Sequence, residues 1–154
     1  MRAAQFLAPL LFGALGACGD SNTASTSDDG GAVCSPASSF PSVALTTVTG
    51  DKGNVRVEFR SAPEPTITAG QQCIEVVVRD ATSGNTIDGL SVTMIPWMPA
   101  MQHGASITPV VTPLGEGRYV FTNVVLSMLG EWELQTHLSG EASDSVEPTF
   151  NVDQ

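Results

Sequence analysis

The segment "NVRVEFR", Asn54 to Arg60, decides the fold class because its side chains alternate strictly between apolar and charged. In an extended chain, successive side chains point to opposite faces, so the apolar set faces one side and the charged set the other. The inward set is Val55, Val57 and Phe59, and the outward set is Arg56, Glu58 and Arg60. This pattern predicts a half-buried β-strand.

The same alternation recurs in two further segments, "CIEVVVRD" from Cys73 and "EWELQTHL" from Glu131. The residues predicted to face the core are Ile74, Val76, Val78, Trp132, Leu134, Thr136 and Leu138. Those predicted to face outward are Cys73, Glu75, Val77, Arg79, Glu131, Glu133, Gln135 and His137.

Weaker strand patterns span residues 43–48, 91–95, 107–111, 118–125 and 149–152. Turn residues separate them, as in Asp51-Lys52-Gly53 and Gly115-Glu116-Gly117. No segment keeps a helical period. We therefore predict an all-β fold, an immunoglobulin-like antiparallel β-sandwich of about seven or eight strands.

The N-terminus has the features of an export signal. Arg2 precedes an apolar run from Ala3 to Phe12, which is too short to span a membrane. Leu15-Gly16-Ala17-Cys18 resembles a bacterial lipobox, which implies cleavage before Cys18 and lipid attachment to it. The alternative is a plain signal peptide cut near Ala17. By the sorting rule for lipoproteins, Gly19 favours an outer membrane location facing the periplasm.

We divide the chain into a signal peptide at 1–17, a lipidated tether at 18–39 and a β-sandwich domain at 40–154. The tether is rich in Ser, Thr, Asp and Gly and has almost nothing to bury, which is typical of a flexible spacer. No other apolar run is long enough to cross a bilayer.

The chain carries 16 acidic and 6 basic residues, a formal net charge of −10. Such a charge repels phosphate, so we exclude a nucleic-acid partner. With Cys18 assigned to lipid, Cys34 and Cys73 remain. A disulfide is the simplest assignment for a pair in an oxidising compartment, and metal ligation is the alternative.

The segment "PWMPAMQHG", Pro96 to Gly104, concentrates soft donors in what we expect to be a stiff loop. Thioether sulfur and imidazole together suit Cu(I). The candidate ligands are Met98, Met101, His103 and Met128. The competing interpretation places these methionines in the core as gap-fillers against Trp97 and Trp132. Strand parity assigns Met94 to the core and His137 to solvent.

Two motifs extend this observation. Met98-Pro-x-Met-x-His-Gly104 is followed by Gly117-x-Tyr119 and Met128-x-Gly-x-Trp132. Together they resemble the YtkA-like domain family, which is related in pattern to FixH-type proteins. The resemblance covers roughly residues 53–152. It implies a small extracytoplasmic immunoglobulin-like domain, often on a lipoprotein, with suspected roles in copper handling.

Carried over to this sequence, the resemblance places the metal ligands at Met98, Met101, His103 and Met128, and packing roles at Tyr119 and Trp132. The chain lacks the Met- or His-rich tail that would help to recruit copper, so any site is single. The expected function is a membrane-anchored copper chaperone, buffer or delivery protein with a protein partner in metal handling.

The alternative function is an immunoglobulin-like interaction module that binds no metal and contacts a membrane protein or an efflux or oxidase-assembly protein. We expect no enzyme activity, because the sequence lacks a G-x-S-x-G elbow, an H-E-x-x-H motif and a phosphate-binding glycine loop.

Overall fold

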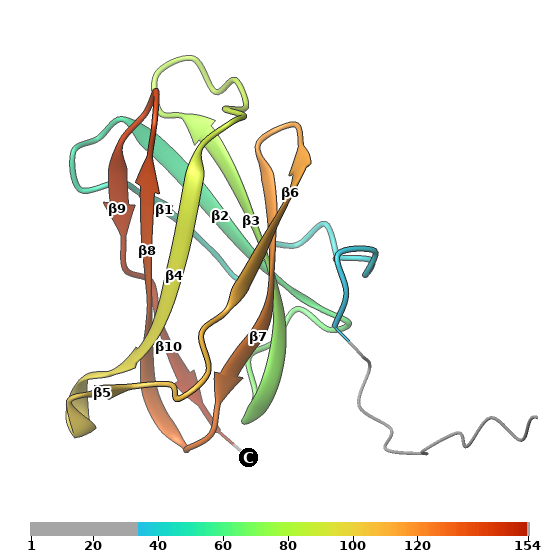
Figure 1. Cartoon of the computed structure of the whole chain (residues 1–154), viewed down its shortest axis with the longest axis vertical. Helices are drawn as coiled ribbons and strands as arrows, with labels where there is room; N and C mark the ends of the chain where they lie inside the picture. The colour runs from blue at the N-terminus through green and yellow to red at the C-terminus, as the bar shows by residue number, and fades with distance from the viewer. Residues whose placement is uncertain (1–33, 154) are drawn as a thin grey trace, which may run out of the picture. The chain divides into compact units, whose positions relative to one another are not determined.

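The computed structural model describes residues 34–153, which form two packed antiparallel β-sheets (Figure 1). The strands are β1 (Thr46–Thr49), β2 (Val55–Ala62), β3 (Gly70–Asp80), β4 (Ser91–Met98), β5 (His103–Gly104), β6 (Val110–Gly115), β7 (Arg118–Leu126), β8 (Gly130–Ser139), β9 (Asp144–Val146) and β10 (Thr149–Val152). A short 3-10 helix, η1 (Pro99–Met101), joins β4 to β5. One sheet has the order β1-β2-β3-β7-β6, and the other has the order β10-β8-β4-β5 with β9 paired to β8.

The core lies between the sheets and follows the predicted alternation. Val55, Val57 and Phe59 of β2 are fully buried, as are Trp132 and Leu134 of β8. Burial of side chains of this size removes them from water and contributes roughly 1.5–3 kcal/mol each. The predicted all-β sandwich is therefore confirmed. The described residues form ten strands where seven or eight were predicted, and two of the ten, β5 and β9, are very short.

The weaker strands differ from their predicted bounds at the ends. The first strand begins at Thr46 instead of Val43, and β6 spans Val110–Gly115 instead of residues 107–111. The prediction for β10 is confirmed, since the strand spans Thr149–Val152. Strand ends carry the least alternation, so they are the hardest to place from a pattern.

The predicted loop from Pro96 to Gly104 is wrong in its first part, because β4 continues through Met98. Proline lacks an N–H donor and is rare inside sheets. Here the Pro96 carbonyl accepts from the Ala105 N–H at 3.0 Å, on the side of the strand away from β8. The missing N–H faces that same side, so Pro96 costs no hydrogen bond in the ladder with β8.

The outward-facing residues of β3 lie on the predicted face, but three of them are covered there. Cys73, Glu75 and Val77 alternate outward, yet all three are buried. Two arginines cover Glu75: Arg118 pairs with it at 2.6 Å, and Arg60 at 3.2 Å. A buried carboxylate needs such partners, because it has lost its hydration.

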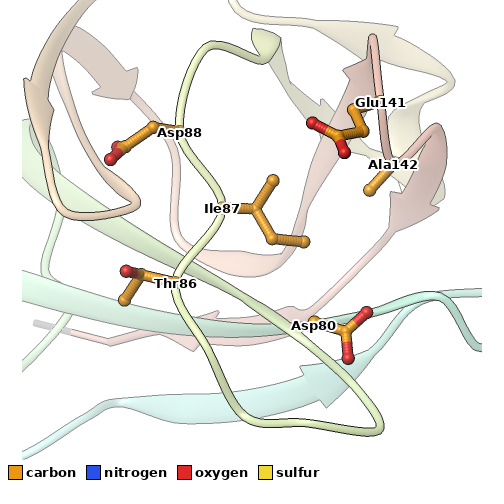
Figure 2. Close-up of a pocket in the computed structure, with 6 residues that line it drawn as sticks. All are labelled: Asp80, Thr86, Ile87, Asp88, Glu141 and Ala142. Atoms are coloured by element: carbon orange, nitrogen blue, oxygen red, sulfur yellow. The ribbon is translucent and has the colours of Figure 1, made fainter.

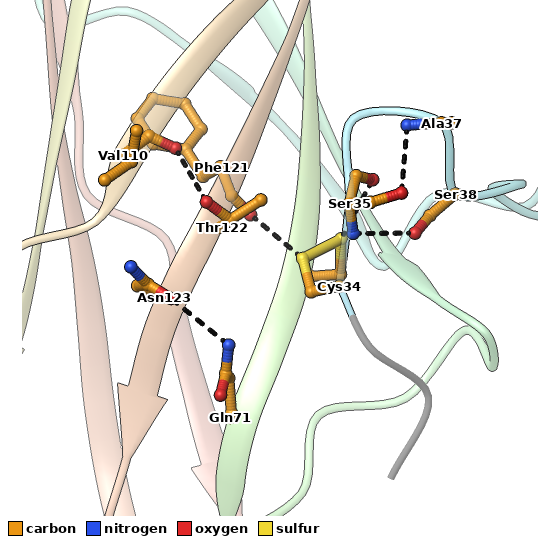
Figure 3. Close-up of a disulfide and its surroundings, with 10 residues drawn as sticks. Cys34, Ser35, Ala37, Ser38, Gln71, Val110, Phe121, Thr122 and Asn123 are labelled. Atoms are coloured by element: carbon orange, nitrogen blue, oxygen red, sulfur yellow. Dashed lines mark hydrogen bonds between the residues drawn. A yellow bond between two sulfur atoms is a disulfide. The ribbon is translucent and has the colours of Figure 1, made fainter. Parts of the chain in front are cut away.

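Cys34 and Cys73 form a disulfide, as predicted, with Cα atoms 5.2 Å apart (Figure 3). The bond attaches the start of the described chain to the outer face of β3. Cys73 lies at an irregularity in the β3–β7 register, beside Asn123, which has a left-handed φ of 60°. The predicted signal peptide, the lipid attachment residue Cys18 and most of the predicted tether lie outside the described residues.

At one end of the sandwich, Asp144 holds the turn between β1 and β2. Its carboxylate accepts the backbone N–H groups of Lys52 at 2.9 Å and Asn54 at 3.0 Å, and also that of Ser145 at 2.8 Å. Burial raises the pKa of Asp144, but the backbone donors outweigh it and the pKa lies below its usual value. Gly50 packs so closely that an added Cβ would overlap the carboxylate.

Candidate functional site

The opposite end of the sandwich holds the candidate metal ligands. Met98 ends β4, and it is the direct cross-strand partner of His103 in the β4–β5 ladder. Side chains that face each other in an antiparallel pair lie on the same side, with Cβ atoms about 4.5–5.5 Å apart. The two residues are therefore adjacent across the ladder, although the sequence interposes four residues between them.

The Met98 side chain turns into the core and is only 6% exposed. Its terminal carbon lies beside Gly130, where an added Cβ would be 3.0 Å away. Gly130 begins β8 with a φ of 120°, so only glycine suits this close approach. Met98 therefore reaches the turn between β7 and β8, which also carries Met128.

The position of Met128 is fixed by Trp132. The indole Nε1–H of Trp132 donates to the Met128 carbonyl at 2.9 Å, and the Trp132 ring is fully buried. Met128 itself is half-buried against the core. This contact explains the spacing of the Met-x-Gly-x-Trp motif: the tryptophan anchors the turn, and the glycine leaves room for Met98.

Met101 and His103 are the exposed members of the set. Met101 ends η1 and is 57% exposed, while Gln102 adopts a left-handed φ of 54° that returns the chain into β5. The His103 Nδ1 lies 3.1 Å from the Gly104 carbonyl. Among the described residues, Nε2 makes no comparable contact. For a histidine ligand this is a common arrangement, in which one ring nitrogen is oriented by a carbonyl and the other binds.

The structure thus brings Met98, His103 and Met128 to one end of the sandwich, with Met101 on the short helix above them. The lower part of Figure 1 shows η1, β5 and the start of β8 at this end. We call Met98, Met101, His103 and Met128 the thioether end. Ile107 and Leu129, both about half exposed, lie in loops at the same end.

Other donor sets are weaker. Among residues 34–153, no three His, Cys, Asp or Glu side chains group in a way that could hold a metal ion. A cavity of about 530 Å³ is lined by Asp80, Asp88 and Glu141 (Figure 2), but its carboxylates serve turns. Asp88 accepts the Gly117 N–H at 2.7 Å, and hydrogen bonds from the Ser83 backbone and hydroxyl lower the pKa of Asp80.

Met94 and His137, which strand parity assigned to the core and to solvent, lie as predicted. Met94 is buried at 2% exposure, and His137 is exposed with its Nδ1 at 3.1 Å from the Ser145 hydroxyl. What sequence reasoning missed is the Arg–Glu network on β2, β3 and β7. Alternation indicated that Arg60 and Glu75 face the same way, but Arg118 comes from a strand far along the chain.

Comparison with known proteins gives one family and one solved structure. A family profile described as YtkA-like matches residues 51–137, which is more than half of the chain. The structure is FetP of uropathogenic E. coli strain F11, crystallised "as isolated" after recombinant expression in the periplasm of E. coli BL21(DE3). It shares 11% identity with a TM-score of 0.47, covering 70% of this chain and 93% of that one. No curated protein matches the sequence. Among the described residues, no helix is long and apolar enough to cross a membrane.

Proposed function

Because the chain belongs to the YtkA-like family, we propose that it is an extracytoplasmic copper-binding protein whose thioether end takes up Cu(I). The observation that carries this proposal is the cross-strand pair of Met98 and His103. It makes two donor residues that lie close in the sequence direct partners across the β4–β5 ladder. Met128 lies in the β7–β8 turn, and the Met98 side chain reaches the same turn at Gly130.

The chemistry of the donor set favours one metal. Thioethers are soft ligands that select Cu(I), whereas sites for harder ions use carboxylates and carbonyls. Neutral thioethers also bind without releasing a proton, so only the imidazole couples binding to pH. Met98, Met128 and His103 would hold the ion, and the exposed Met101 would complete the site or deliver the ion to it.

Support for an extracytoplasmic location comes from the Cys34–Cys73 disulfide. Disulfides persist in oxidising compartments and are rare in the cytosol. The lipobox ending at Cys18 extends the proposal to a lipid-anchored protein, held at the outer membrane and facing the periplasm. In this role the domain binds and passes on an ion and catalyses no reaction.

The experiment that tests copper binding is a Cu(I) competition titration against a chromophoric chelator. The chain from Cys18 onward is compared with its Met98→Leu/Met101→Leu/Met128→Leu variant. Leucine nearly conserves the volume of methionine, so the core should survive. We expect one Cu(I) per chain in the parent and none above background in the variant. Equal affinities with an intact fold would overturn the proposal.

A second function, an interaction module without metal, is favoured by the exposed apolar side chains at the same end. Met101, Ile107 and Leu129 are 57%, 48% and 47% exposed, and Trp97 is partly exposed near the end of β4. Clustered exposed Met and aromatic side chains are typical of protein contact surfaces. The two functions separate by mutation: Met101→Leu should impair only metal binding, and Trp97→Ala should impair only a protein contact.

A further inference from the structure

The outer face of the five-stranded sheet has a charge unlike that of the rest of the domain. Strands β2, β3 and β7 place four arginines and two glutamates on it. We call this the arginine face, and its charged residues are Arg56, Glu58, Arg60, Glu75, Arg79 and Arg118. Formally it carries +2.

The remaining described residues are strongly acidic. Residues 34–153 hold 13 carboxylates and 5 basic side chains. Without the arginine face, eleven carboxylates and Lys52 remain, a formal charge of −10. None of these carboxylates lies on the outer face of β2, β3 or β7. All but one of the basic side chains of the described chain are therefore gathered on one sheet surface.

Part of this face is a structural network and part is not. Arg60 and Arg118 neutralise the buried Glu75, and Arg60 also pairs with Glu58 at 2.8 Å. Arg56 and Arg79, by contrast, stand directly opposite each other on β2 and β3. Like charges in that position destabilise a sheet. Arg79 pairs with Glu58 at 3.5 Å and donates to the Gly84 carbonyl at 3.3 Å, and Arg56 is exposed.

The described chain also begins on this face. Cys34 is bonded to Cys73, which lies on the outer side of β3 two residues from Glu75. The chain from Cys18 to Cys34 spans at most about 55 Å when fully extended. An anchor at Cys18 would therefore keep Cys34, on the side of the arginine face, within about 55 Å of the membrane.

We propose that the arginine face docks on an anionic lipid surface, so that the anchored domain lies with this sheet toward the membrane. This inference rests on the anchor at Cys18 in the proposed function. Basic side chains are attracted to anionic headgroups within about one Debye length, roughly 8 Å at physiological salt. The acidic remainder is repelled, which adds to the preference for one orientation.

The test measures which sheet faces the bilayer. The chain from Cys18 onward is coupled through the Cys18 thiol to a maleimide lipid in vesicles. A dye is attached to an azide-bearing residue incorporated at Thr49, on the arginine-face side, or at Thr93, on the other sheet. Energy transfer to a headgroup acceptor is compared on vesicles with and without phosphatidylglycerol. We expect the Thr49-to-Thr93 ratio of transfer efficiency to exceed one only on anionic vesicles.

The matched variant is Arg56→Gln/Arg79→Gln, which leaves the partners of Glu75 in place. It should bring the ratio back toward one, as should high salt, which shortens the Debye length to about 3 Å. Glu131→Gln/Glu133→Gln on the other sheet keeps the arginine face, so the ratio should stay above one. A ratio of one on anionic vesicles would overturn membrane docking. An acidic protein surface would then be the partner to test for the arginine face. A ratio that does not change with lipid charge, with salt or in the Arg56→Gln/Arg79→Gln variant would also overturn membrane docking.

The outcome is separable from copper binding. The maleimide supplies the anchor whether or not the cell lipidates Cys18, and no metal is present. A failed Cu(I) titration therefore leaves the orientation result standing, and a failed orientation leaves the titration standing.

Discussion

The two ends of the sandwich are built from opposite kinds of contact. At the Asp144 end, one buried carboxylate satisfies three backbone N–H groups and closes a turn around Gly50. At the thioether end, a cross-strand pair joins Met98 and His103, and Met101 is exposed. The first end uses its polar groups for stability, and under our proposal the second end offers its soft donors to Cu(I). Mutations should therefore separate stability from binding.

The largest loss of stability is expected for Gly50→Ala. Its Cβ would displace the Asp144 carboxylate, and a buried acceptor and three backbone donors would lose their geometry. We expect the free energy of unfolding to fall by about 3 kcal/mol or more, measured by urea denaturation. Gly53→Ala, which has open space but a φ of 74°, is the control and should cost only about 1 kcal/mol.

Asp144→Asn should cost less, about 1–3 kcal/mol, because an amide can accept at only one of the two oxygens that now accept. The pKa of Asp144 is lowered in the folded state. Its stabilisation is therefore complete above the unfolded-state pKa near 3.8 and is lost as the pH falls through the folded value. Urea unfolding across this acidic range should show a shallower pH dependence in the variant. An identical slope would exclude Asp144 as its source.

Met98→Leu should change stability by less than about 1.5 kcal/mol, since the swap nearly conserves volume. Cu(I) affinity should fall at least about tenfold, the loss expected when one ligand is removed. Met94→Leu is the matched control, because Met94 is buried on the same face of the same strand, β4, before Met98. If both variants bind Cu(I) like the parent, Met98 is a core residue only.

The smallest effect on folding is expected for His103→Ala. His103 is exposed, so the free energy of unfolding should stay within about 0.5 kcal/mol of the parent. Cu(I) affinity, measured by the same competition titration, should nevertheless fall about tenfold or more. His137→Ala, equally exposed but on β8, should change neither quantity.

Sequence alternation predicted the fold well because the period of two follows directly from strand geometry. The alternation did not predict that β4 continues through Pro96. The cost of the missing proline N–H depends on which neighbouring strand lies on that side of the residue. The alternation also did not predict the burial of Glu75, which requires Arg118 from β7. The role of Asp144 was invisible for the same reason, because Lys52 and Asn54 lie about 90 positions earlier.

The candidate site was predictable as a set of residue types and only partly as a geometry. Methionine and histidine in one segment indicated soft-metal chemistry. The pairing of Met98 with His103 arises because η1 reverses the chain, and a short 3-10 turn has no periodic signal. The approach of Met98 to the β7–β8 turn depends on the contact at Gly130, which links residues 32 positions apart.

The disulfide on β3 also determines how the domain would respond to mechanical force. A pull applied through an anchor at Cys18 enters the domain at Cys34 and passes at once to Cys73 in β3, a central strand paired with both β2 and β7. The intervening segment carries no load. With a separation of 39 residues, the bond withholds about 140 Å of contour length from any extension. The domain therefore resists being unravelled from its N-terminal side, and its acidic body stays folded close to the point of attachment.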